Sequence, residues 1–141
     1  MLIQSGNNNV EIVATEVEPV GSPRAGDIRV NLDVNSEGFH GCSSAWVAVD
    51  DFADFLRQLQ ELEAARKGIA VLRSMSPGAT QLEFKAIDRW GHIAIRGRLT
   101  KYGHAGGFDH VLEFGFEIES DRLAEIVAGF RRIARGDISS P

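Results

Sequence analysis

The sequence is poor in the residues that build disulfide frameworks, thiolate metal sites and membrane spans. Cys42 is its single cysteine, so no internal disulfide can form and no metal site can be made from thiolates alone. No apolar run approaches the roughly 20 residues that a transmembrane helix needs. The N-terminus has neither the basic start nor the apolar core of a signal peptide. These absences favour a cytoplasmic protein without a membrane partner.

The chain also lacks an obvious reactive constellation. Its four histidines show no metal-ligand spacing and no HExxH motif. His40 and Cys42 invite a nucleophile hypothesis, because a nearby histidine can activate a thiol. Residues at this spacing on a strand share a face without the close approach of a dyad, so a structural cysteine is the favoured interpretation. We therefore expect a protein that is not an enzyme, with no catalytic residue, cofactor or metal site.

Two further motifs have simple structural interpretations. The glycine-rich segment 103–107 joins two expected strands, so it lacks the helix N-terminus that lets glycine loops bind phosphate. Asp50 and Asp51 stand at the start of an expected helix, where carboxylates suit the positive end of the dipole. The sequence therefore predicts a hairpin loop and a helix start at these places.

Charge is distributed unevenly between the two halves of the chain. Residues 1–63 hold eleven acidic and three basic residues, a net charge of −8, whereas residues 64–141 hold nine acidic and twelve basic residues, a net charge of +3. An acidic half argues against direct nucleic-acid binding, which needs clustered cations, and is compatible with docking to a basic protein. Acidic surfaces also serve solubility alone, so charge does not decide the partner.

What the sequence does contain is the same pattern twice: an alternating strand, an acidic or hydroxyl residue, then an amphipathic helix. The apolar positions of each helix fall on one face, at Phe52, Phe55, Leu56 and Leu59 and again at Leu123, Ile126, Val127 and Phe130. The first helix is predicted over about 51–66 with Asp50 as N-cap, and the second over about 120–135. The alternative is a coincidental recurrence of a common pattern.

Period-two alternation marks the expected strands, most clearly over 28–34. The segment 88–91 has the composition of a tight turn, and the register that it sets places Phe84 opposite Ile95 inside and Glu83 opposite Arg96 outside. The fold class is therefore α+β. We predict about eight mainly antiparallel strands in two sheets or one bent sheet, with two helices, in the order β4-α-β4-α.

One domain over residues 1–136 is expected, with halves at about 1–67 and 68–136 and a frayed tail at 137–141. Trp46 and Trp90 are candidate interface anchors, because exposed tryptophans are enriched at binding hot spots. If Val47 faces the core, Trp46 faces outward on the same face as Cys42. For both tryptophans the alternative is that another element covers the indole.

Several segments together resemble the WapI-type immunity protein family. They occur in the same order from about Asn35 to Ile133 and comprise residues 37–41, 52–59, 72–78, 82–84, 88–93 and 114–118. These are turn and core patterns rather than active-site residues. The resemblance implies a small soluble bacterial protein, and the characterised type is an antidote that binds and blocks the nuclease part of a wall-associated toxin.

The resemblance thus implies a non-catalytic protein that binds and neutralises a cognate toxin. A generic protein-binding or ligand-binding scaffold is the alternative, and an enzyme that uses the His40 and Cys42 face is the least favoured interpretation. Because nuclease toxins are often basic, an acidic face could supply complementary charge. The candidate partner-binding residues are Asp33, Glu37, Trp46, Asp54 and Glu61.

Overall fold

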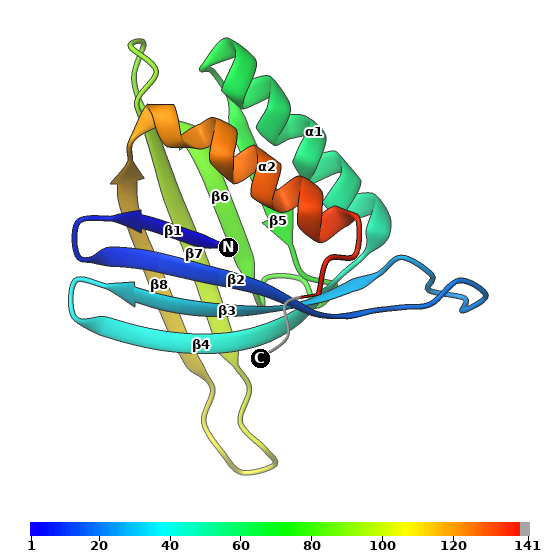
Figure 1. The fold of residues 1–141 in the computed structure, drawn as a ribbon. Helices are drawn as coiled ribbons and strands as arrows, with labels where there is room; N and C mark the ends of the chain where they lie inside the picture. Colours follow the sequence, from blue (N-terminus) through cyan, green and yellow to red (C-terminus); the bar gives the residue numbers. More distant parts are fainter. Residues whose placement is uncertain (139–141) are drawn as a thin grey trace.

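The computed structural model describes residues 1–138 as two four-stranded antiparallel sheets and two α-helices (Figure 1). The first sheet has the strand order β1-β2-β3-β4 and the second has the order β5-β6-β7-β8, so both are meanders. One helix follows each sheet, which confirms the predicted α+β class and its β4-α-β4-α order. The first unit comprises β1 (Leu2–Ser5), β2 (Asn8–Val17), β3 (Ile28–Ser36), β4 (Phe39–Val47) and α1 (Val49–Ala65). The second comprises β5 (Ile69–Arg73), β6 (Gln81–Ala86), β7 (Ile93–Lys101), β8 (His110–Ile118), the 3-10 turn η1 (Ser120–Arg122) and α2 (Leu123–Ala134).

The alternation of the sequence sets which strand faces are buried. In β3 every second residue from Ile28 to Val34 is buried, while the residues between them reach the outer face. The β6–β7 register pairs Phe84 with Ile95 and Glu83 with Arg96, as the turn composition predicts. Each sheet therefore has one apolar face and one polar face.

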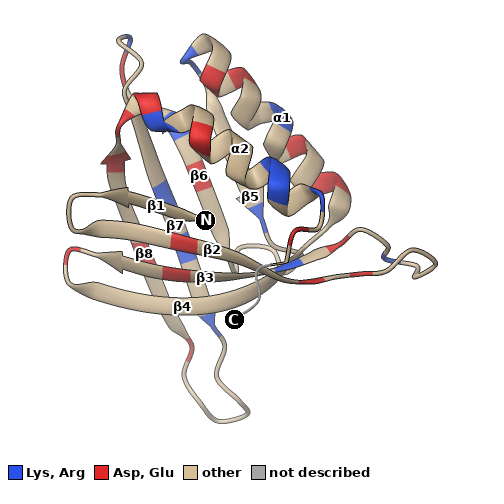
Figure 2. Cartoon of the chain, in the orientation of Figure 1, with Lys and Arg blue, Asp and Glu red and all other residues tan. Residues whose placement is uncertain are grey.

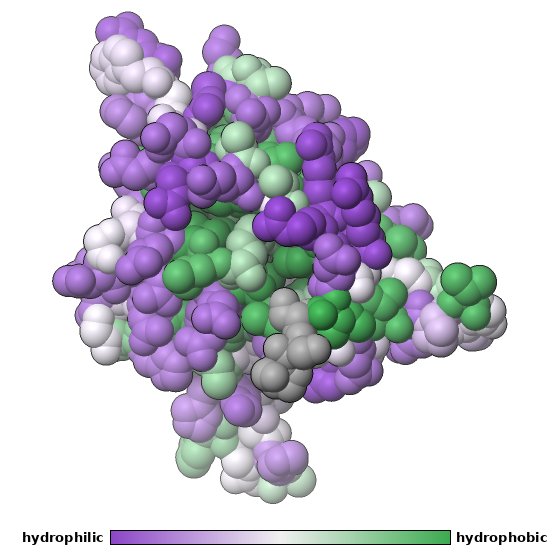
Figure 3. Space-filling view, in the orientation of Figure 1, coloured by the Kyte–Doolittle hydropathy of each residue, from purple (hydrophilic) through white to green (hydrophobic). Residues whose placement is uncertain are grey.

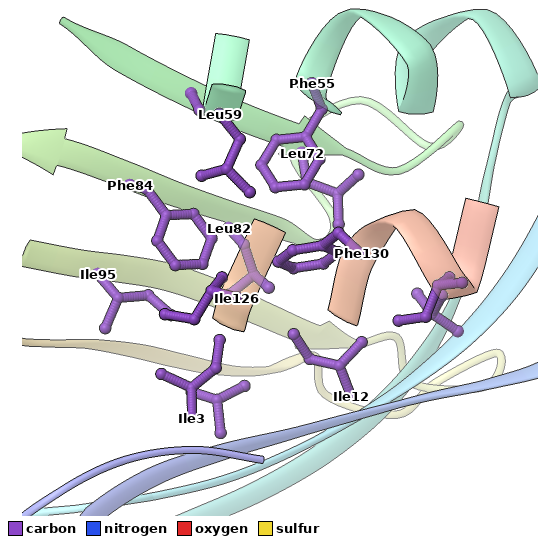
Figure 4. Packing of buried hydrophobic residues seen from close by; sticks show 14 of the residues in the cluster. Ile3, Ile12, Phe55, Leu59, Leu72, Leu82, Phe84, Ile95, Ile126 and Phe130 are labelled. Carbon is purple, nitrogen blue, oxygen red and sulfur yellow. The ribbon is translucent and has the colours of Figure 1, made fainter. Parts of the chain in front are cut away.

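The two sheets cross at a large angle, and both helices lie on the same side of the second sheet as the first sheet does (Figure 1). One core cluster unites residues from both sheets and both helices (Figure 4). At its centre the Phe55 and Phe130 rings are 4.8 Å apart at 83°, and Phe84 lies 6.0 Å from Phe130 at 85°. These are edge-to-face arrangements, each of which contributes about 0.5–1.5 kcal/mol beyond the buried area.

Glycines allow the two sheets to pack closely. A Cβ on Gly41 of β4 would lie 2.7 Å from a methyl carbon of Leu112 in β8, so a side chain at this crossing would have to displace that methyl group. Within the second sheet, a Cβ on Gly97 would lie 2.4 Å from the Phe114 ring. The glycines that loosen these strands in sequence therefore mark places of close approach.

The start of α1 differs from the prediction. The helix begins at Val49, earlier than expected, and neither the N-cap residue Ala48 nor Asp50 caps it with a side chain. Instead the Val49 N–H donates to Oδ1 of Asp27 at 3.0 Å, a carboxylate that comes from the loop between β2 and β3. The helix ends at Ala65, and Arg66 at its C-cap is left-handed with φ 57°.

Two other boundaries also differ. The second helical segment starts with the short turn η1, so α2 proper begins at Leu123. Asp137 and Ile138 lie beyond α2 outside regular structure, whereas 139–141 of the predicted tail fall outside the described residues. Within residues 1–138, no helix combines the length and the apolar character needed to cross a membrane.

Candidate partner-binding surfaces

The outer face of the first sheet is a polar surface formed by β2, β3 and β4. Asp33 lies at its centre, directly opposite Glu11 on β2 and Cys42 on β4. The His40 ring donates from Nε2 to Oδ1 of Asp33 at 3.1 Å, and both side chains are about half exposed. Two carboxylates thus face each other across neighbouring strands, an arrangement that is unfavourable until a cation approaches.

Glu37 lies at the end of this face, in the turn between β3 and β4. Its backbone is left-handed with φ 50°, and its N–H donates to Oδ1 of Asn8 at 3.0 Å. The side chain is exposed. Asp33 and Glu37 therefore belong to one acidic region, which Figure 2 shows on β2, β3 and the adjoining turn.

Trp46 stands at the other end of β4, opposite Arg29 on the outer face, while its neighbour Val47 is buried. The indole is half-buried because the Arg24 guanidinium lies over it, 5.5 Å from the ring centroid. Arg24 also pairs with Oδ2 of Asp27 at 3.2 Å and approaches the sulfur of Met75 at 3.0 Å. The Asp27 carboxylate, which also accepts the first N–H of α1, therefore holds Arg24 over the Trp46 ring.

Asp54 and Glu61 lie on the exposed face of α1. Both contact Arg57, whose guanidinium lies 3.8 Å from Asp54 and 3.2 Å from Glu61. Such exposed pairs contribute little stability but cancel part of the negative charge. The five predicted residues thus fall into three places: Asp33 with Glu37, Trp46 alone, and Asp54 with Glu61.

The outer face of the second sheet carries a mixed-charge surface that was not predicted from the sequence. A hollow of about 580 Å³ lies there, lined by the side chains of Arg96, Arg98, Glu83 and Glu113 among others. Arg98 pairs with Glu113 at 3.0 Å across β7 and β8. Only the alternation of charge with apolar residues in β6, β7 and β8 signals this face in the sequence.

The β6–β7 turn is an exposed feature of the second unit that several hydrogen bonds hold. Oδ1 of Asp88 accepts hydrogen bonds from the N–H groups of Trp90 and His92, at 2.8 and 3.2 Å, and Oδ2 accepts one from Nδ1 of His92. Partial desolvation acts to raise the pKa of Asp88, but these hydrogen bonds and the His92 charge outweigh it and lower the pKa. The bond to Asp88 and its charge raise the pKa of His92.

Two kinds of reactive group bear on what these surfaces could do: metal-ligating side chains and the thiol of Cys42. Among residues 1–138, no three His, Cys, Asp or Glu side chains gather as a metal site would require. Cys42 is exposed and faces the carboxylate of Asp33, whereas reactive cysteines have cationic surroundings. Asp33 does supply the orienting partner for His40 that the sequence did not reveal, so a reactivity test of Cys42 retains its value.

Comparison with known proteins identifies the family to which the chain belongs. The sequence profile of an immunity protein family matches residues 1–135, and the chain belongs to this immunity protein WapI-like family, as its motifs predict. No curated protein matches the chain.

Two similar solved structures carry the titles "Structure of the plant transcriptional regulator PBF-2" and "Crystal Structure of WHY3 from Arabidopsis thaliana". The first is 10% identical, with 95% of this chain and 79% of that chain covered and a TM-score of 0.48. The second is 10% identical, with 95% and 85% covered and a TM-score of 0.47. Similarity at this level gives no information about what this chain binds.

Proposed function

We propose that this chain is a non-catalytic immunity protein of the bacterial cytoplasm that binds a cognate toxin and occludes its active site. Membership of the immunity family over almost the whole chain is the observation that carries this proposal. The toxin is proposed to be a basic protein such as a nuclease, because the first half of the chain has a net charge of −8.

The acidic surface around Asp33 and Glu37 supports this choice of partner. Asp33 and Glu11 face each other across β2 and β3, with His40 as the basic neighbour that contacts Asp33. A lysine or arginine of a toxin would relieve this repulsion on binding. Asp54 and Glu61 on α1 form a second, weaker patch because they share Arg57.

The ligand-binding scaffold has less support in the described residues. A ligand-binding scaffold would have a deep apolar pocket between the sheets, but side chains fill that space (Figure 4). The hollow on the second sheet is open, and charged side chains line it together with polar and apolar ones, so it is not an apolar pocket. On the face that carries α2 and the first sheet, hydrophilic side chains surround a central area of hydrophobic ones (Figure 3). These features suit a protein partner better than a small molecule.

Co-expression with the toxin candidate encoded next to this chain tests the proposal. The native chain is expected to restore growth and to co-purify with the toxin. Absence of both protection and binding would contradict the function. Normal, slow alkylation of Cys42 at neutral pH is the result that would remove the enzyme alternative.

A charge variant tests the surface. Combined Asp33→Asn, Glu37→Gln, Asp54→Asn and Glu61→Gln substitutions should slow association with that toxin by about tenfold or more and flatten its salt dependence. The control carries the same change in net charge elsewhere, through Glu83→Gln, Glu113→Gln, Glu119→Gln and Glu125→Gln. Equal association rates for the two variants would show that net charge, rather than this surface, attracts the toxin.

A further inference from the structure

A largely exposed tryptophan stands on the β6–β7 turn, which projects beyond α2 (Figure 1). Trp90 is 72% exposed, and the Arg89 guanidinium lies over its ring at 4.7 Å from the centroid. Ile87, at the base of the turn, is also exposed. An indole left largely in water forfeits most of the hydrophobic free energy that it could contribute to folding. Its position is therefore not explained by the stability of the free protein.

The turn is nevertheless held firmly in one conformation. Asp88 accepts both the Trp90 and His92 N–H groups, and the Ile87 N–H donates to the His92 carbonyl at 2.9 Å. Gly91 has φ +85°, which a side chain rarely adopts, so the backbone at this point favours glycine. These constraints hold the backbone that carries Trp90.

The base of the turn is also anchored to the body of the protein. A Cβ on Gly91 would lie 3.2 Å from Cβ of Arg66, so Gly91 packs directly against the end of α1. The Arg66 guanidinium donates to the Ser120 carbonyl in η1. The end of α1, the β6–β7 turn and η1 thus support one another, and the Trp90 side chain projects from a rigid base.

A second exposed aromatic shows the contrast. Phe108 is 85% exposed, but it lies in the glycine-rich connection between β7 and β8 at the opposite end of the second sheet. Three glycines lie between Lys101 and Phe108, and a side-chain hydrogen bond from the Gly103 N–H to Oδ1 of Asp109 holds this connection, whereas Asp88 accepts three hydrogen bonds in the β6–β7 turn. Exposure is shared by the two loops, but the β6–β7 turn is held by more side-chain hydrogen bonds.

We infer that the β6–β7 turn, residues 87–92, is an anchor that inserts Trp90 into an apolar slot on the toxin, with Arg89 paired to an acceptor at the rim of the slot. This inference rests on the proposed function and adds to it a contact surface distinct from the acidic one. Tryptophan and arginine are the side chains most enriched at interface hot spots. A rigid turn also lowers the entropy lost on binding, because its conformation is already that of the complex.

A protein slot suits the turn better than a nucleic acid does. Acidic side chains lie near the turn: Glu117 acts on the pKa of His92, and Glu119 and Asp121 flank the Ser120 carbonyl that Arg66 binds. These carboxylates would repel phosphates, whereas the indole and the guanidinium need an apolar surface with a carbonyl or carboxylate oxygen at its edge.

The binding experiment compares four proteins against the adjacent toxin domain by calorimetry or biolayer interferometry. Trp90→Ala should raise the Kd by about thirtyfold or more, the effect of a hot-spot residue. Phe108→Ala, the matched control, should leave it within about twofold. Asp88→Ala keeps the indole but frees the turn and should raise the Kd by about threefold to tenfold. Because Trp90 is exposed, its replacement should leave the melting temperature unchanged.

The outcomes separate the two proposals. A native chain that neither binds the toxin nor protects against it overturns the proposed function, and this inference with it. A native chain that binds, together with an unchanged Kd for Trp90→Ala, overturns the inference alone. Two results without toxin would also overturn it: a dimer that the Trp90→Ala substitution abolishes, or quenching of Trp90 fluorescence by a single-stranded oligonucleotide at physiological salt.

Discussion

Asp27 in the first half of this protein and Asp88 in the second both accept hydrogen bonds from backbone N–H groups, but they do so over very different distances in sequence. Asp27 in the first half reaches from the β2–β3 loop to the first N–H of α1, and it is buried with 5% exposure. Asp88 in the second half binds groups within its own turn, and its side chain is 24% exposed. The first connects distant parts of the chain, whereas the second shapes a local loop.

The difference predicts that Asp27 contributes to the stability of the fold, whereas Asp88 holds the turn that carries Trp90. The other oxygen of Asp27 binds Arg24, which in turn covers Trp46 and approaches Met75. Removal of Asp27 would therefore disturb the helix start, the β2–β3 loop and the end of β4 together. Removal of Asp88 would release only a turn whose principal side chain, Trp90, already points into solvent. We expect the first aspartate to govern folding and the second to govern binding.

The largest loss of stability is expected from substitution of Phe130 in α2, where the two halves meet. Its ring lies within 6.2 Å of the Phe52, Phe55 and Phe84 centroids, and it is fully buried. Phe130→Ala should lower the free energy of unfolding by about 3–5 kcal/mol through lost burial and the cavity that remains. Chemical denaturation monitored by circular dichroism measures this. A loss below about 1 kcal/mol would show that the halves do not share one core.

A smaller loss of stability is expected from substitution of Asp27. It tests whether this residue connects distant parts of the chain. Asp27→Ala leaves the Val49 N–H without its acceptor and Arg24 without its carboxylate, and should lower the free energy of unfolding by about 1–3 kcal/mol. Asp27→Asn keeps an acceptor for Val49 and should lose less. Hydrogen exchange in the first turn of α1 should rise in Asp27→Ala. Equal stability of Asp27→Ala and the native chain would contradict the cap.

The two aspartates also show what the sequence could and could not predict. The turn at Asp88 follows from neighbouring residues, so its composition predicted both the turn and the register of Phe84 with Ile95. The cap from Asp27 joins residues 22 apart in sequence, and no local pattern signals it, so Asp50 was the wrong choice. The strand β1 has four residues, too few for period-two alternation to identify it.

The candidate site shows the same contrast between features that neighbouring residues determine and features that distant contacts determine. The outward direction of Trp46 could be predicted from the burial of Val47, because strand faces alternate. The positions of Asp33, Glu37, Asp54 and Glu61 relative to one another could not, since they depend on how α1 packs against the sheets. The rigidity of the Trp90 turn depends on Arg66 and η1, which lie far from it in sequence. Local patterns predict elements and faces, whereas long-range packing decides which faces form one surface.

The smallest expected effect is a change with pH in the order of the β6–β7 turn, through Asp88 and His92. The pKa of His92 is raised above its ordinary 6.5, so its bond to Asp88 stabilises the turn fully below that pH and is lost as the pH rises through the folded-state pKa. The pKa of Asp88 is lowered from 3.8, so its contribution is present above that pH and is lost as the pH falls through the folded-state pKa. The turn should therefore be most ordered between about pH 3.8 and 6.5.

An NMR titration of His92 tests this pH dependence. Asp88→Ala should move the pKa of His92 down toward its ordinary value, whereas Glu117→Gln should move it less, because Glu117 contributes less than Asp88 to the raised pKa. An unchanged His92 titration in Asp88→Ala would mean that the carboxylate does not hold the turn, and that Trp90 is exposed without being pre-organised.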